Sequence, residues 1–139
     1  MPTSFRVEIG QSTINEILRK VRAFEWHEAP QGPGLEDSWA YGANLNYMRE
    51  LCRYWVENYD WYHWQDELNR YAQYRAEIEG LPIHFYHEPG SGPAPLPLIL
   101  SHGWPGSVFE FLHIIDQLAH PERHGGDARD AFTVIVPSL

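Results

Sequence analysis

The stretch Leu98–Ser107 reads LILSHGWPGS and joins an apolar run to a turn made of glycine and proline. The apolar run predicts a buried strand. Residues 108–118 carry hydrophobic side chains at helical spacing and predict a helix. A second apolar run, Phe132–Val136, predicts another strand. Two such strands flanking a helix indicate a βαβ unit, a parallel sheet covered on both faces, and hence an α/β fold.

The turn within this stretch is the strongest candidate for a functional site. Gly103 permits a sharp backbone turn close to a ligand, and Pro105 fixes the next backbone angle. Ser107 can cap the helix that follows. Together they direct backbone N–H groups, notably that of Trp104, toward the carboxyl end of the sheet, where α/β proteins place their sites. An N–H held there can stabilise a developing oxyanion, and we expect His102 to brace the turn by bonding to backbone.

A β-hairpin is predicted upstream of this unit. Residues 74–79 and 83–88 both alternate between polar and apolar side chains, and the connection passes through residues 80–82. Residues 5–9 alternate weakly and predict a short extended segment. Residues 89–97 contain four prolines and two glycines and predict a surface loop.

Residues 12–73 are predicted to be helical, apart from a loop at 29–43. Thr13 with Glu16 fits a capping box, Asn44 or Asn46 can cap a second helix, and Asp60 a third. The apolar positions predict a buried, aromatic-rich side, formed by Ile14, Ile17, Leu18, Val21 and Phe24, then Tyr47, Met48, Leu51, Trp55 and Tyr59, then Trp61, Trp64, Leu68 and Tyr71.

Composition excludes several classes of protein. The formal charge of −9 over 139 residues argues against binding nucleic acid or an anionic membrane through a basic surface. No apolar stretch approaches the roughly 20 residues of a membrane helix, and no signal peptide is visible, so we expect a cytoplasmic protein. Cys52 is the only cysteine, which excludes an internal disulfide and a thiolate metal cluster.

The other chemically active side chains favour structural roles. His84 and His87 lie three apart on a strand, face opposite sides, and cannot share a metal ion. His63 and Glu67 lie on neighbouring turns of one helix and fit a solvated face better than a metal site. Cys52 is expected in the core. Five aromatic residues are also expected in the core: Tyr47, Trp55, Trp61, Trp64 and Tyr71. The acidic side chains fit helix caps and a solvated helix face; they are Glu57, Asp60, Asp66 and Glu67.

Several separated motifs resemble one family. The sequence HGWPGS is followed by Phe109-Glu110-Phe111 and, later, by VIVPSL; upstream lie YWVENYDW at 54–61, Glu67-Leu68-Asn69, and GLPIHF at 80–85. In this order they resemble the epoxide hydrolases of the microsomal type, which have the α/β-hydrolase fold. The resemblance implies an N-terminal helical region at 1–73 and the first strands and first helix of an α/β-hydrolase domain at 74–139.

The resemblance also implies a two-step hydrolysis of an epoxide to a vicinal diol. An Asp attacks an epoxide carbon, tyrosines of a cap assist ring opening, and a His activates the water that cleaves the resulting ester. Only the oxyanion-hole turn maps onto this chain, at the Trp104 N–H supported by His102, Gly103 and Pro105. The nucleophile, the tyrosines and the His are expected beyond Leu139, so the chain is expected to be incomplete and inactive alone. No cofactor or metal is implied, and the substrate is expected to be a small apolar epoxide.

One acidic residue mimics the family's nucleophile. Asp127 lies in Gly125-Gly126-Asp127-Ala128-Arg129, which is similar to the family's Gly-Gly-Asp-Trp-Gly elbow. An elbow needs a strand before it and a helix after it. Asp127 instead follows a predicted helix and precedes a predicted strand, so we interpret it as a loop residue.

Two alternatives remain open at this point. The chain fits part of another α/β hydrolase, such as an esterase, although no G-x-S-x-G is present. It also fits a non-catalytic protein that pairs with another chain, or with a second copy, through an open strand edge beside Leu98–Leu100.

Overall fold

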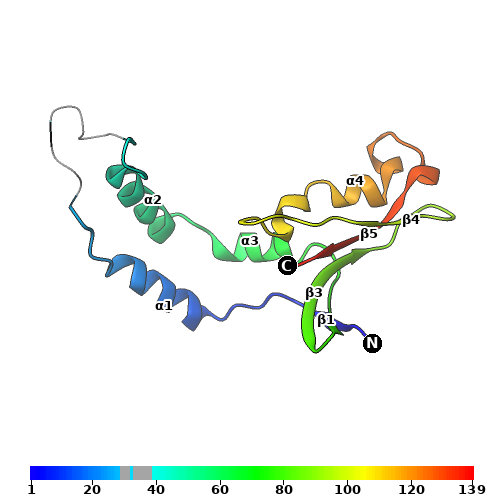
Figure 1. Ribbon diagram of the computed structural model, residues 1–139, viewed down its shortest axis with the longest axis horizontal. Helices are drawn as coiled ribbons and strands as arrows, with labels where there is room; N and C mark the ends of the chain where they lie inside the picture. The colour runs from blue at the N-terminus through cyan, green and yellow to red at the C-terminus, as the bar shows by residue number, and fades with distance from the viewer. Residues whose placement is uncertain (29–31, 33–38) are drawn as a thin grey trace. The chain divides into compact units, whose positions relative to one another are not determined.

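The computed structural model describes residues 1–28, 32 and 39–139, which form two compact units (Figure 1). The first unit combines Met1–Glu8 with His63–Leu139, and the second unit is Ile9–Tyr62. The first unit contains the sheet, and the second contains the first two helices.

A five-stranded sheet organises the first unit. Its strand order is β1-β2-β3-β5-β4, with β1 at Thr3–Phe5, β2 at Gln73–Ile78, β3 at Leu81–Glu88, β5 at Phe132–Pro137 and β4 at Leu96–Ile99. Only β4 and β5 run parallel; the other neighbours are antiparallel. The sheet therefore combines the predicted hairpin with the predicted βαβ unit, and the predicted α/β fold class is confirmed.

The hairpin turn is shorter than the sequence predicts. Glu79 and Gly80 alone connect β2 to β3, with φ angles of 52° and 81°. A two-residue hairpin turn with positive φ at both positions matches the right-handed twist of its strands. Leu81 and Pro82, predicted in the loop, thus belong to β3, and Pro82 lies opposite Glu77.

The first strand also lies earlier than expected. It covers Thr3–Phe5 rather than residues 5–9. The Val7 backbone is bonded instead to a side chain, because Asn69 accepts the Val7 N–H at 2.9 Å and donates to the Val7 carbonyl at 2.8 Å. This reciprocal pair takes Val7 out of the sheet ladder.

The core lies on one face of the sheet. Tyr86, Val134 and Val136 are at most 1 % exposed, and Tyr86 lies directly opposite Val136, so these side chains share a face. Residues from the segment between β4 and β5 cover it, including the fully buried Ile115. Among the described residues every buried sheet side chain lies on this face, so these residues do not supply the cover predicted for the second face.

The predicted helix at 108–118 is divided in two. A 3-10 helix, η1, spans Val108–Phe111, and the short helix α4 spans Ile115–Ala119. Hydrophobic spacings of three and four residues fit both kinds of helix, so the pattern alone could not separate them. Both pieces contribute to the core through Val108, Leu112 and Ile115.

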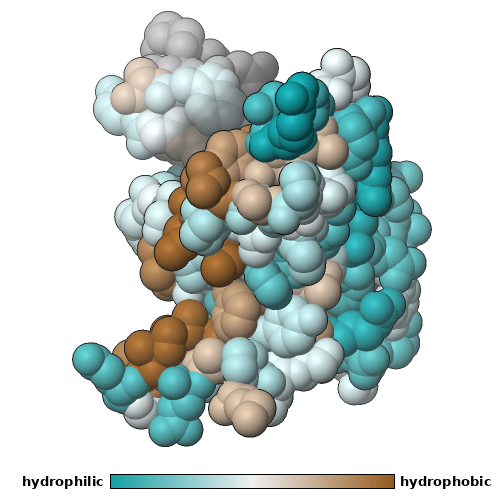
Figure 2. Space-filling view, turned by 90° about the vertical axis from the view of Figure 1, so that its right-hand side faces the viewer, coloured by the Kyte–Doolittle hydropathy of each residue, from teal (hydrophilic) through white to brown (hydrophobic). Residues whose placement is uncertain are grey.

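The strand β4 lies at the edge of the sheet. The Leu100 N–H, just past β4, donates to the Ile135 carbonyl at 2.9 Å. Because successive residues of a strand point their backbone groups to opposite sides, Pro97 and Ile99 direct theirs toward the free edge. The Leu96 and Ile99 side chains are about two-thirds exposed. Figure 2 shows brown, hydrophobic residues at the surface beside teal, hydrophilic ones.

Two of the three helix starts can be compared with their predicted caps. Asn44 accepts the Tyr47 N–H at 2.9 Å and caps α2 (Leu45–Glu57), which confirms Asn44 rather than Asn46 of the two predicted caps. In contrast, α1 spans Gln11–Arg22, so Thr13 lies inside the helix and caps nothing. Glu16 pairs with Arg19 instead of closing a capping box. The pattern of Thr followed three residues later by Glu also occurs within helices, where i,i+3 pairs form.

The predicted aromatic-rich buried side is wrong for the second helix. No residue of α1, α2 or α3 (Trp61–Leu68) is fully buried. The half-buried face of α2 carries Met48, Cys52 and Val56. Tyr47 and Trp55, expected in the core, are 51 % and 39 % exposed, because the inward face is displaced by one residue from the aromatic positions.

No helix among the described residues is long and apolar enough to cross a membrane. Residues 29–31 and 33–38, most of the loop expected at 29–43, lie outside the described residues.

Candidate functional site

The candidate turn lies where the two parallel strands end. Because β4 and β5 are parallel neighbours, their carboxyl ends meet at one edge of the sheet. His102 follows β4, and its Nε2 accepts the N–H of Leu139, two residues past β5, at 3.2 Å. Its Nδ1 lies 3.3 Å from the Gly103 carbonyl and carries the ring proton. His102 thus joins the two segments that leave the sheet at this edge.

A second histidine holds the same segment after β5. His84, on β3, contacts Ser138 Oγ through Nδ1 at 2.8 Å and Gln73 Oε1 through Nε2 at 3.0 Å. Gln73 is buried and donates to the Leu68 carbonyl at 2.9 Å. Burial of the ring, and secondarily the charge of Arg75, lowers the pKa of His84. Ser138 and Leu139 are therefore each bonded to a histidine.

Within the turn, one backbone bond spans Trp104 and Pro105. The Gly106 N–H donates to the Gly103 carbonyl at 2.5 Å. The Trp104 indole is almost fully exposed, and the Trp104–Pro105 peptide bond is cis. No partner for the Trp104 N–H occurs among the described residues. This N–H is a donor available to a ligand.

The turn ends in a capping box that the sequence analysis missed. Ser107 Oγ accepts the Phe109 N–H at 3.3 Å, and the Ser107 N–H donates to Glu110 Oε1 at 3.1 Å. The signal was present, since Ser followed three residues later by Glu is the capping-box pattern. The sequence analysis predicts Ser107 as a cap, and the structure adds Glu110 as its reciprocal partner.

Asp127 lies in an exposed turn rather than at a strand end. It caps η3 (Ala128–Asp130) by accepting the Arg129 N–H at 2.9 Å, and its carboxylate pairs with the Arg129 guanidinium. The hydrogen bonds from Arg129 lower the pKa of Asp127. The preceding element is η2 (Pro121–His124), and the following strand is β5. This order is the reverse of a nucleophile elbow, which needs a strand and then a helix.

The remaining candidates are dispersed. His84 and His87 face opposite sides of β3, and the His87 ring contacts Tyr74. Glu67 lies 3.9 Å from Arg70, in a solvated i,i+3 pair. His120, unnoticed in the sequence, is buried and contacts Glu88 at 2.9 Å, 32 residues away. No group of three His, Cys, Asp or Glu side chains able to hold a metal ion occurs in the described part of the chain.

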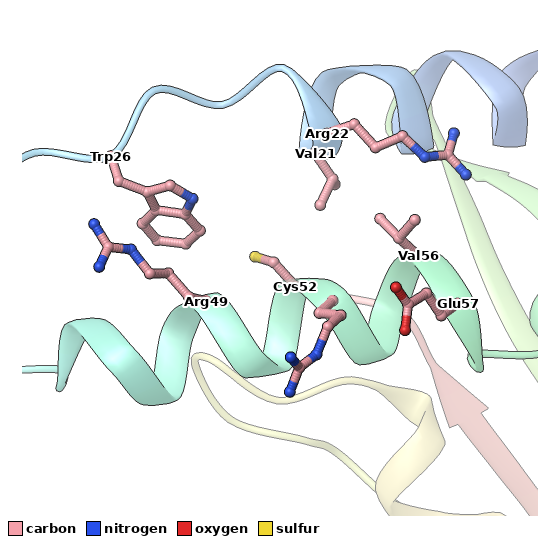
Figure 3. Close-up of a pocket in the computed structure, with 8 residues that line it drawn as sticks. Val21, Arg22, Trp26, Arg49, Cys52, Val56 and Glu57 are labelled. Atoms are coloured by element: carbon pink, nitrogen blue, oxygen red, sulfur yellow. The ribbon is translucent and has the colours of Figure 1, made fainter.

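A shallow groove of about 190 Å³ lies between α1 and α2 in the second unit (Figure 3). The Cys52 thiol points into it, and Val21 and Val56 face each other across it. The guanidinium groups of Arg22 and Arg49 extend in different directions, so the arginines do not converge on one point. The groove is the partly filled contact between two helices.

Comparison with known proteins defines the family. Residues 2–111 match the family model described as "Epoxide hydrolase N terminus". The chain is 42 % identical over 137 residues to a putative epoxide hydrolase of Stigmatella aurantiaca, covering 99 % of this chain and 30 % of that protein. It is 38 % identical over 140 residues to epoxide hydrolase 1 of Sus scrofa, covering 97 % and 30 %.

Solved structures agree with the sequence comparisons. Aspergillus niger epoxide hydrolase matches with a TM-score of 0.81 at 29 % identity, covering 100 % of this chain and 35 % of that one. Juvenile hormone epoxide hydrolase of Bombyx mori matches with a TM-score of 0.84 at 28 % identity, covering 100 % and 36 %. The fold is that of the α/β-hydrolase class, to which these solved epoxide hydrolases belong. The chain belongs to the epoxide hydrolase family and corresponds to its N-terminal region, spanning about a third of the length of these relatives.

Proposed function

We propose that this chain supplies the oxyanion-hole turn of an epoxide hydrolase, with the Trp104 N–H as the donor. The observation that carries the proposal is the position of this turn at the carboxyl edge shared by β4 and β5, with the Trp104 N–H unbonded among the described residues. A preorganised N–H stabilises negative charge that develops on a carbonyl oxygen.

The proposed reaction converts an epoxide and water into a vicinal diol. A carboxylate attacks one epoxide carbon, the C–O bond breaks, and the ring oxygen takes a proton, leaving a hydroxy ester. A histidine then removes a proton from water, and the resulting hydroxide adds to the ester carbonyl. The negative charge passes to the carbonyl oxygen, where the Trp104 N–H donates to it. When this intermediate collapses, its C–O bond to the diol breaks and the diol oxygen takes the proton held by the histidine. The carboxyl group returns its proton to the tyrosine that opened the ring and is a carboxylate again.

Within this scheme the residues of this chain position the turn and stabilise the negative charge on the carbonyl oxygen. His102, Gly103 and Pro105 hold the turn, and the proposal places the nucleophile, the ring-opening tyrosines and the water-activating histidine outside these 139 residues. The substrate class is a small apolar epoxide. The division into a helical region at 1–73 and a hydrolase domain at 74–139 stays a prediction. Its boundaries differ from those of the two compact units in the structure.

A chimera tests the proposal directly. This chain replaces the matching third of the Stigmatella aurantiaca relative, and hydrolysis of an aryl epoxide is measured. Trp104→Phe keeps the backbone N–H and should retain the parent rate. Trp104→Pro removes the N–H and should lower the rate about 100- to 1000-fold.

The step that slows identifies the role of the N–H. The Trp104→Pro chimera should still form the ester and should accumulate it, detectable as a mass increase of the protein. Equal rates for the Phe and Pro variants would contradict an oxyanion role. Hydrolysis of aryl esters but not epoxides by the parent chimera would favour the esterase alternative.

A further inference from the structure

The turn that carries Trp104 has little packing of its own. Ser101, Gly103, Trp104, Pro105 and Ser107 are all exposed. Within these 139 residues core contacts therefore do little to fix its shape, and local hydrogen bonds hold it. One such bond, from the Gly106 N–H to the Gly103 carbonyl, closes the turn around Trp104.

The carboxylate of Glu110 lies against the residue that closes the turn. A Cβ atom added at Gly106 would lie 1.8 Å from Glu110 Oε1 and 2.7 Å from the Gly103 carbonyl oxygen. The Glu110 carboxylate thus occupies the space of a side chain at position 106. An ordinary capping box makes no such demand on the residue before the cap, so this contact goes beyond capping.

Glu110 also belongs to an anchored segment. Its neighbours in η1 include Val108, which is buried, and Phe109, whose ring lies 5.5 Å from that of Trp64. The Ser107 N–H donates to Glu110 Oε1 at 3.1 Å, and the Glu110 N–H donates to the Ser107 carbonyl at 3.1 Å. Glu110 therefore connects the exposed turn to the core.

We propose that Glu110 is the positioning residue of the turn, acting through Ser107 and Gly106 to hold the Trp104 N–H in place. The inference rests on the proposed oxyanion role for its functional meaning, but the positioning itself is a property of the chain alone. Gly106 is the second part of this arrangement, since a Cβ atom at position 106 would push the flexible end of Glu110 out of its place.

The test uses amide NMR of the 139-residue chain. Glu110→Ala should shift the Trp104 amide resonance and speed hydrogen exchange at Ser107 and Gly106 by about fivefold to tenfold, the loss of one hydrogen bond. Glu110→Gln retains an acceptor oxygen and should restore both properties. Gly106→Ala should shift the Trp104 amide by displacing the carboxylate. Glu77→Gln, on an exposed position of β2, is the matched control. It should change neither the Trp104 amide resonance nor the exchange rates at Ser107 and Gly106.

The outcomes separate this proposal from the oxyanion role. If Glu110→Ala lowers thermal stability while the Trp104 amide stays unmoved, Glu110 is only a helix cap and the proposal is overturned. If the Trp104 amide moves in the chain but Glu110→Ala leaves the chimera's ester hydrolysis unchanged, the positioning stands and the oxyanion role fails. Failure of Glu110→Gln to restore the Trp104 amide would also overturn the proposal.

Discussion

His102 and Leu139 are 37 residues apart in the sequence, and a single hydrogen bond joins them at the carboxyl edge of the sheet. The imidazole Nε2 accepts the Leu139 N–H, so the segments that follow β4 and β5 are held together. His102→Ala should remove this bond and speed hydrogen exchange of the Leu139 amide about fivefold. Amide exchange rates measured by NMR test this prediction. His113→Ala, at an exposed position, is the control and should leave exchange at Leu139 unchanged. Unchanged exchange at Leu139 would show that the bond contributes nothing in solution.

The core on the α4 face of the sheet should dominate stability. Ile115 is fully buried, so Ile115→Ala should lower the free energy of unfolding by about 2–4 kcal/mol. Ile99→Ala removes the same atoms from an exposed position of β4 and should cost less than about 0.5 kcal/mol. Urea denaturation of the two variants gives the comparison, and similar losses would contradict the one-sided core.

Tyr86 should make the stability depend on pH in the alkaline range. Burial raises the pKa of its hydroxyl from 10.0 to about 12, and the hydroxyl donates to the Leu68 carbonyl at 2.7 Å. A folded-state pKa above the unfolded value favours the folded state below pH 10, and this contribution is lost as pH rises toward 12.

Tyr86→Phe provides the control for that pH dependence. It should be less stable than the parent at pH 7, because the Leu68 carbonyl loses its donor. The difference between the two proteins, measured by urea denaturation, should narrow between pH 10 and 12. A difference that stays constant over this range would mean that Tyr86 ionises alike in both states.

The hairpin turn offers a stabilising substitution. Glu79 has a φ of 52°, a region that asparagine adopts more readily than glutamate. Glu79→Asn creates the Asn-Gly pair favoured in two-residue hairpin turns and should raise stability by up to about 1 kcal/mol. Thermal unfolding measures the gain. Gly80→Ala is the opposing control and should lower the melting temperature, since Gly80 also has positive φ.

Asp127 should prove irrelevant to hydrolysis. The 139-residue chain should show no turnover of an aryl epoxide above background, with or without Asp127→Ala. In the active chimera, Asp127→Ala should retain the parent rate, because this exposed carboxylate only caps η3 and pairs with Arg129. Turnover by the chain alone that disappears on substitution would make Asp127 the nucleophile.

A sequence pattern predicts a helix, strand or cap best where few local structures fit that pattern. The apolar strand β5 and the hairpin strands follow from patterns with a single period, and the Asn44 cap is one of the two caps that the sequence predicts. Prediction failed where a pattern fits two structures. The spacing from Thr13 to Glu16 suits a capping box and a helix interior alike, and the helix begins at Gln11.

The position of the candidate turn could be predicted from the sequence, but its long-range hydrogen bonds could not. The turn around Gly103 could be located from glycine, proline and the flanking apolar runs. The bonds from His102 to Leu139 and from His84 to Ser138 join residues 37 and 54 positions apart. Such contacts depend on strand order and register, which no local pattern encodes.

The proline at position 97 has a consequence for the chain's behaviour at high concentration. A strand that approached the free edge of β4 would meet the carbonyl of Pro97 but no N–H there, so its ladder would lack a donor at the centre of the four-residue strand. Growth of stacked sheets into fibrils needs an unbroken row of donors and acceptors. Within these 139 residues Pro97 therefore interrupts the row of donors along β4 and leaves any strand that pairs there one hydrogen bond short.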